Sequence, residues 1–134
     1  MSDMVTTLKP RQDHERLDVY RVALAFAGWE RRLRVPRGNS DLADQLRRAA
    51  TSIVLNVAEG AGEFSQADKR RFYRMARRSA AECAAALDIL EAGGDLAADS
   101  LEPGQTLLTR VVAMLTKMVP RADREPPGDA LRRG

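Results

Sequence analysis

The sequence is poor in the residue types that carry most metal and nucleophile chemistry. It contains one cysteine, Cys83, and one histidine, His14, in 134 residues. A single cysteine cannot form an intramolecular disulfide or supply a cysteine zinc cluster. A single histidine excludes His-rich metal sites. We therefore expect no bound metal and no cofactor.

Long apolar runs are also missing. No uncharged stretch approaches the roughly 20 residues that a helix needs to cross a bilayer, and the start, MSDMVTTLKPRQDHERL, lacks the apolar core of a signal peptide. With 44% hydrophobic and 31% charged residues, the composition is that of an ordinary soluble domain. The sequence predicts a single-domain, cytoplasmic protein that does not associate with membranes.

Alanine and arginine are unusually abundant in the sequence. The chain has 21 Ala, and 19 of its 22 basic residues are Arg. Both are strong helix formers, and alternating runs of β-branched residues are absent. The net charge of +3 and the pI near 9.5 permit nucleic-acid or acidic partners without requiring them. The composition predicts an all-α protein.

Four amphipathic segments are separated by helix-breaking residues, which lie at Pro36–Gly38, Gly60–Gly62, Gly93–Gly94 and Pro120. Four helices joined by short connections predict an up-down-up-down antiparallel four-helix bundle over residues 17–119. Residues 1–16 are expected to form a flexible arm and residues 120–134 a disordered tail. In each segment, apolar residues recur three or four positions apart and so lie on one face of the helix; we call each such row a seam. The four seams comprise Val19, Val22, Phe26, Trp29 and Leu33, then Leu42, Leu46, Ala49 and Ile53, then Phe72, Ala76, Cys83, Ala86 and Leu90, then Leu108, Val111, Leu115 and Met118.

Residues with capping side chains predict where each helix begins. Ser, Thr, Asp and Asn accept hydrogen bonds from the first free N–H groups of a helix. A Ser-x-x-Asp sequence resembles the capping box. The predicted starts, in chain order, are Asp18, Asn39 or Ser40, the capping box Ser65–Asp68, and Asp99 or Ser100.

Polar side chains interrupt the seams of the second and third segments. Asn56 and Ser79 occupy positions that the pattern assigns to apolar residues. A buried polar group without a partner costs about 1–3 kcal/mol, so these residues should meet. In this network we expect Arg48 or Arg77 to pair with Glu59 or Glu82. Its predicted members are Arg48, Ser52, Asn56, Glu59, Ser79 and Glu82.

Two interpretations of this network remain open. It can fix the register of the helices or a subunit contact, as a buried Asn does in coiled coils. Alternatively, Glu59 and Glu82 can form a catalytic carboxylate pair, which also needs a pocket and shifted pKa values. We favour the structural interpretation and expect no catalytic residue. A di-iron bundle is excluded because His14 lies outside the bundle, and Cys83 on the seam is expected to be an inert core residue.

A basic segment follows the second break. The stretch DKRRFYRMARR contains six basic residues and one acid. Guanidinium groups suit phosphate oxygens, and Tyr73 adds a ring beside them. A solvated helix face is the alternative. The residues expected to contact RNA or DNA form one stripe at i, i+4, i+7 and i+8, extended by an arginine of the second helix; they are Arg70, Arg74, Arg77, Arg78 and Arg47.

The stretch QLRRAATSIVLNVAEGAGEFS, followed by FYRMARRSAAE, resembles the four-helix-bundle proteins encoded by intervening sequences of bacterial 23S ribosomal RNA genes. The opening Leu17–Tyr20 is similar too, and the resemblance extends from Leu17 to Val119. This sequence departs from the family pattern in having Val54 in place of a proline and Arg78 in place of a glycine. The resemblance implies a bundle that assembles as a ring, typically a homopentamer.

The same family is distantly similar to the accessory proteins of diversity-generating retroelements, which bind a reverse transcriptase and nucleic acid. The sequence therefore leads to two hypotheses. The first is a non-enzymatic, homo-oligomeric accessory protein with weak, sequence-independent affinity for RNA or DNA and a protein partner such as a reverse transcriptase. The second is a protein-interaction scaffold with no nucleic-acid role. An enzyme ranks third.

Overall fold

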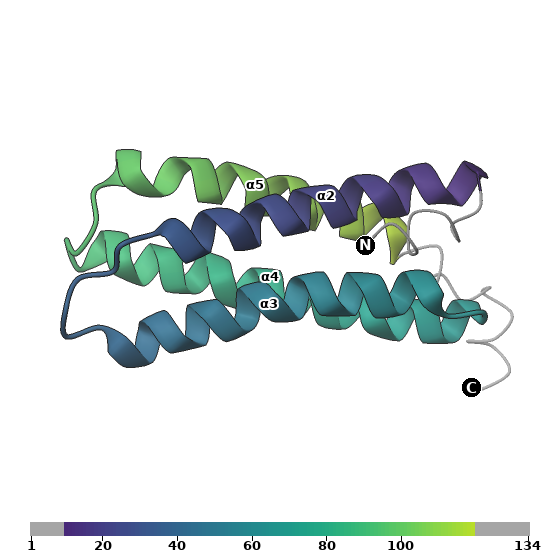
Figure 1. The fold of residues 1–134 in the computed structure, drawn as a ribbon, viewed down its shortest axis with the longest axis horizontal. Coiled ribbons are helices and arrows are strands. Elements are labelled where there is room, and N and C mark those ends of the chain that lie inside the picture. The colour runs from purple at the N-terminus through teal and green to yellow at the C-terminus, as the bar shows by residue number, and fades with distance from the viewer. Residues whose placement is uncertain (1–9, 120–134) are drawn as a thin grey trace, which may run out of the picture.

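A computed structural model describes residues 10–119, which form four α-helices. These are α2 (Pro10–Arg32), α3 (Ser40–Gly62), α4 (Gln66–Ala92) and α5 (Ala98–Met118). The helices lie along one long axis, each packs against the next in sequence, and α2 also packs against α5 (Figure 1). The expected antiparallel four-helix bundle is confirmed. Residues 1–9 of the predicted arm and the predicted tail 120–134 lie outside the described residues.

The core contains most of the predicted apolar seams, and it also contains residues that the seams omitted, Leu87 and Leu101 among them. The fully buried side chains come from all four helices and include Phe26, Ile53, Leu87 and Leu115. On α4, Tyr73 is buried and Phe72 is only half-buried. The expectation that Tyr73 lies beside the surface arginines is therefore wrong, because its ring packs into the bundle.

Two helices begin where predicted and two do not, and of the two that agree only α4 has a side-chain cap, since Asn39 makes no capping hydrogen bond at the start of α3. α3 begins at Ser40, and Ser65 caps α4 by accepting a hydrogen bond from the Asp68 N–H at 3.1 Å. The start at Asp18 is wrong, because α2 begins at Pro10, a residue that suits a first helical turn. The start of α5 is also earlier than predicted, since Ala97 is its N-cap and provides no side-chain hydrogen bond.

Two glycines inside helices allow large rings to approach the backbone. A Cβ on Gly60 would lie 2.5 Å from Cε1 of Tyr73, and a Cβ on Gly104 would overlap the indole of Trp29. The break predicted at Gly60–Gly62 agrees with the end of α3 at Gly62, and Gly60 lies in the last turn of the helix. Its role is therefore to admit Tyr73 between α3 and α4.

The loops at one end of the bundle are tied together. Gly38 and Gly94 have φ angles of 95° and 74°, which glycine adopts readily in turns. Nδ2 of Asn39 donates to Oδ1 of Asp95 at 3.3 Å and joins the α2–α3 loop to the α4–α5 loop. The turn from α3 to α4 lies at the opposite end (Figure 1). The basic segment of α4 therefore begins far from these two loops.

Candidate functional site

Arginines dominate the outer surface of the first half of α4, which we call the basic face; its residues are Arg70, Arg71, Arg74, Arg77 and Arg78. Four of them line one hollow of about 500 Å³ together with Met75 and Ala81. Arg74 and Arg78 are exposed, whereas Arg70 and Arg77 are half-buried. Three members of the predicted stripe, Arg74, Arg77 and Arg78, therefore line one hollow together with Arg71, whereas Arg70 does not line it.

Few acids lie against this face. Arg71 pairs with Asp68 at 3.8 Å, and its guanidinium stacks over the Phe72 ring with its carbon 4.9 Å from the ring centroid. Both ends of that ion pair are exposed, so it contributes little to stability. Within residues 10–119, Arg77 and Arg78 form no ion pair. The face therefore keeps a concentrated positive charge.

Two basic residues near the face do not belong to it. Lys69 is buried, and its Nζ donates to the carbonyl of Gly60 at 3.4 Å, near the end of α3. A lysine that caps the last carbonyls of a helix stabilises that helix end. Arg47, expected to extend the stripe, lies on the α2 side of α3, where its Nε is 3.6 Å from Oε2 of Glu30. The structure thus separates Arg47 from the basic face.

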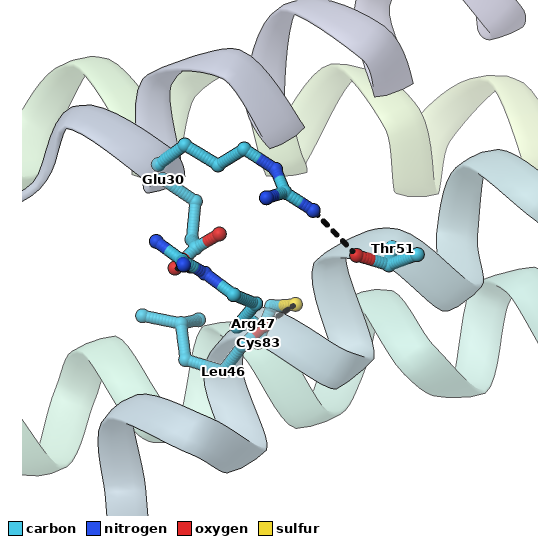
Figure 2. A network of polar contacts seen from close by, with 6 residues as sticks. Glu30, Leu46, Arg47, Thr51 and Cys83 are labelled. Atoms are coloured by element: carbon cyan, nitrogen blue, oxygen red, sulfur yellow. Dashed lines mark hydrogen bonds and ion pairs between the residues drawn. The ribbon is translucent and has the colours of Figure 1, made fainter. Parts of the chain in front are cut away.

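The contact between α2 and α3 holds this ion pair. Glu30 and Arg47 point toward one another, and Nη2 of Arg31 donates to Oγ1 of Thr51 at 3.4 Å (Figure 2). Glu30 is buried, and the pairing offsets part of the cost of burying its carboxylate. The sequence did not lead us to expect a buried Glu30, because we extended the apolar seam from Phe26 to Trp29, three residues on. Glu30 lies four residues after Phe26, and this spacing also places a side chain on the buried face of the helix.

Three residues of the predicted polar network meet between α3 and α4. Nδ2 of Asn56 donates to both the carbonyl oxygen and Oγ of Ser52 at 2.9 Å. Oγ of Ser79 donates to Oγ of Ser52, also at 2.9 Å. Ser79 is buried, and the other two are half-buried. These bonds satisfy the polar groups that interrupt the two seams and fix the register of α4 on α3.

The three charged members of the predicted network are not joined to it. Arg48 and Glu82 line a groove of about 580 Å³ between α3 and α4, whose floor includes Ser52 and Ser79. Among the described residues, the side chains of Arg48, Glu82 and Glu59 form no hydrogen bond and no ion pair. The expected pairing of Arg48 or Arg77 with Glu59 or Glu82 is therefore absent from this part of the chain.

The register also separates the two candidate catalytic carboxylates. Glu59 lies seven residues beyond Ser52 along α3, and Glu82 lies three residues beyond Ser79 along the antiparallel α4. At 1.5 Å per residue, this displaces the two carboxylates by about 15 Å along the bundle. Carboxylates that act together as acid and base are about 5–10 Å apart. Glu59 and Glu82 do not form such a pair.

The remaining chemical candidates are structural. Burial, followed by the negative charges of Glu30 and Glu82, raises the pKa of Cys83 to about 12, and its Sγ lies 4.0 Å from the carbonyl of Leu46. A thiol in this state is a poor nucleophile. The described helices contain no cluster of three His, Cys, Asp or Glu residues that could hold a metal ion.

No helix within residues 10–119 combines the length and apolarity needed to cross a membrane. A comparison with curated proteins finds no match. A comparison with family models matches residues 15–117 to one family, described as 23S rRNA-intervening sequence protein. The match covers most of the chain, including α3, α4 and the Ser52–Asn56–Ser79 contacts between them. The chain therefore belongs to the 23S rRNA-intervening sequence protein family, as the resemblance of its second and third segments predicted.

Proposed function

We propose that this chain is a non-enzymatic, homo-oligomeric accessory protein whose basic face binds RNA or DNA weakly and without sequence preference. One observation supports this above all. Four arginines line a single hollow on α4, and Arg77 and Arg78 have no ion pair among the described residues. Surface charge kept only for solubility would not need to be concentrated on half of one helix.

The chemistry of the face suits a phosphate backbone. Guanidinium groups donate several parallel hydrogen bonds to phosphate oxygens. The face offers no stacking platform for bases, because Tyr73 is buried and Phe72 lies under the guanidinium of Arg71. Such binding reads the backbone and not the sequence, and it weakens steeply with salt because counterions are released.

Assembly would strengthen these weak contacts. The resemblance of the sequence implies a ring, typically of five subunits, and a ring repeats the basic face once per subunit. Several weak contacts on one nucleic acid then act together through a high effective concentration. A protein partner such as a reverse transcriptase is part of the same proposal and would share the bound nucleic acid.

A protein-interaction scaffold with no nucleic-acid role is the second candidate. It is favoured by the exposed apolar side chains of Leu55, Met75 and Ile89 on α3 and α4. Large exposed apolar side chains can contribute to protein–protein contacts. The two candidates differ in one measurable property, which is the affinity for a phosphate backbone.

The test is a titration of labelled single- and double-stranded RNA and DNA at several salt concentrations. Replacing Arg74 and Arg78 together by Glu should weaken binding at low salt by at least tenfold. It should also reduce the slope of log K against log salt by about 2, since each phosphate contact contributes about 0.9. Both residues are exposed, so the fold should tolerate the change.

A matched control reverses the same amount of charge elsewhere. Arg34 and Arg37 are also exposed, and they lie in the α2–α3 loop at the opposite end of the bundle (Figure 1). Their replacement by Glu should leave the slope close to that of the wild type. An equal loss in both variants would attribute binding to net charge alone. Absence of binding by the wild-type chain at low salt would overturn the nucleic-acid proposal and leave the scaffold.

A further inference from the structure

One large apolar side chain projects entirely into solvent. Phe64, in the turn between α3 and α4, is 100% exposed, whereas the other exposed large apolar side chains among the described residues have exposed fractions of 41% to 59%. The ring therefore contributes nothing to the core of the bundle. Single exposed apolar residues are common on protein surfaces, so the surroundings of Phe64 decide what the ring can do.

Hydrogen bonds fix the backbone on both sides of Phe64. Before it, the N–H of Glu63 donates to the carbonyl of Gly60 at 3.3 Å. After it, Oγ of Ser65 accepts from the N–H of Asp68 at 3.1 Å. The turn is thus held in one conformation, and a ligand of the Phe64 ring does not have to order the turn first.

The turn leads directly into the basic face. Arg71, Arg74 and Arg78 are exposed, and they lie about 8, 12 and 18 Å along α4 from its first residue. At about 100° per residue, the three side chains also fall within about 60° around the helix. A phosphate backbone that follows these arginines toward the start of α4 therefore arrives at the turn that carries Phe64.

The charges next to the ring differ from those of the basic face. Glu63 precedes Phe64 in the turn, and Asp68 in the first turn of α4 is paired with Arg71 at 3.8 Å. These carboxylates repel a phosphate at the turn but do not repel an uncharged base. The surface thus offers cations to a backbone along the helix and an aromatic ring to a base at the end of the helix.

We propose that Phe64 stacks on an unpaired base of a single-stranded nucleic acid whose phosphates lie on the basic face. Proteins that bind single strands without sequence preference combine a cationic surface with aromatic rings on which bases stack. The bases of a duplex are stacked on one another inside it, so only an unpaired base can reach the ring. The inference rests on the proposed function and narrows its ligand from RNA or DNA in general to single strands.

Removal of the ring tests the proposal. Phe64→Ala should weaken the binding of labelled single-stranded RNA and DNA about five- to hundredfold, the loss typical of a stacking ring replaced by alanine. The affinity for a duplex of the same length should stay within about twofold of the wild type. The slope of log K against log salt should not change, because stacking releases no counterions. The double replacement of Arg74 and Arg78 by Glu should reduce that slope.

Two further variants separate stacking from general apolar contact. Phe64→Tyr keeps an aromatic ring and should bind single strands within about threefold of the wild type. Phe64→Leu keeps apolar surface without a ring and should resemble Phe64→Ala. Leu24→Ala, at an exposed apolar residue of α2, is the matched control and should leave all affinities unchanged. Thermal melts of the Phe64 variants should match the wild type, since the side chain is fully exposed.

The outcomes separate this inference from the function on which it rests. A wild-type chain that binds neither single strands nor duplexes at low salt overturns both. Binding that the double arginine replacement weakens and Phe64→Ala leaves unchanged overturns only the stacking. An equal loss for single strands and duplexes in Phe64→Ala, or wild-type affinity in Phe64→Leu, overturns the stacking as well. A loss for RNA alone or for DNA alone upholds it and assigns the strand.

Discussion

Two adjacent arginines of α3 have opposite surroundings. Arg47 turns toward α2, where its Nε lies 3.6 Å from Oε2 of the buried Glu30. Arg48 turns toward the groove between α3 and α4, where it forms no hydrogen bond or ion pair with the described residues. On the α2 side of α3, Arg47 and Thr51 have polar partners within the chain. On the groove side, the residues with side-chain hydrogen bonds are Ser52, Asn56 and Ser79.

The difference indicates what each side is for. A polar group whose partner is in the same chain stabilises the fold, and its loss leaves that partner buried and unsatisfied. A charged group without such a partner costs the fold little when it is removed. It can form a charge pair with a second molecule instead. The comparison therefore predicts that substitutions on the two sides change the free energy of unfolding to different degrees.

Cys83 lies between the two sides and should show the largest effect. Its pKa of about 12 reflects burial first, then Glu30 on one side and Glu82 on the other. At pH 8 about one thiol in ten thousand is ionised when the pKa is near 12, against about one in ten at 9. Alkylation of the native protein by iodoacetamide should therefore be about a thousandfold slower than that of the unfolded chain.

The sign of the associated pH dependence follows from the same shift. The folded thiol holds its proton more tightly than the unfolded one, whose pKa is 9.0. The contribution of Cys83 to stability is therefore complete below about pH 9 and is lost as the pH rises toward 12. Cys83→Ala should flatten that part of the stability profile. A native alkylation rate within tenfold of the unfolded rate would show that the thiol is accessible and ionised.

Replacing each arginine by methionine tests the comparison directly. Arg47→Met leaves the Glu30 carboxylate buried without its partner and should lower the free energy of unfolding by about 1–3 kcal/mol. Arg48→Met should change it by less than about 0.5 kcal/mol, as most surface substitutions do. Urea denaturation of dilute monomer measures both. Equal effects of the two substitutions on the free energy of unfolding would contradict the difference in surroundings.

The fold was predictable because apolar spacing and helix breaks are local properties of the sequence. The breaks at Gly60–Gly62 and Gly93–Gly94 lie close to the observed ends of α3 and α4. The helix starts were less predictable. α2 extends back past Asp18 to Pro10, and α5 begins after Ala97, which caps it without a side-chain hydrogen bond. A helix can begin without a capping side chain, so a cap residue in the sequence marks one of several permitted starts.

The site was predictable only where one helix determines the contact. Asn56 meets Ser52 because residues four apart face each other on a helix. Pairs between helices depend on the register and on which way each side chain turns. Neither is visible in the sequence, and this explains the failure of the expected pairing between Arg48 and Glu59. The pairing of Arg47 with Glu30 was missed for the same reason.

The smallest effect concerns the hydrogen bond between Ser52 and Ser79, which lies in the groove between α3 and α4. Ser79→Ala removes the hydrogen bond to Ser52 Oγ, while Ser52 still accepts from Asn56. The free energy of unfolding should fall by about 0.5–1.5 kcal/mol, the net contribution of one such bond. Ser40→Ala, at an exposed serine, is the matched control and should be nearly neutral. If Ser79→Ala left the free energy of unfolding unchanged, the Ser52–Ser79 hydrogen bond would not stabilise the packing of α4 on α3, and the division between the two sides of α3 would need to be redrawn.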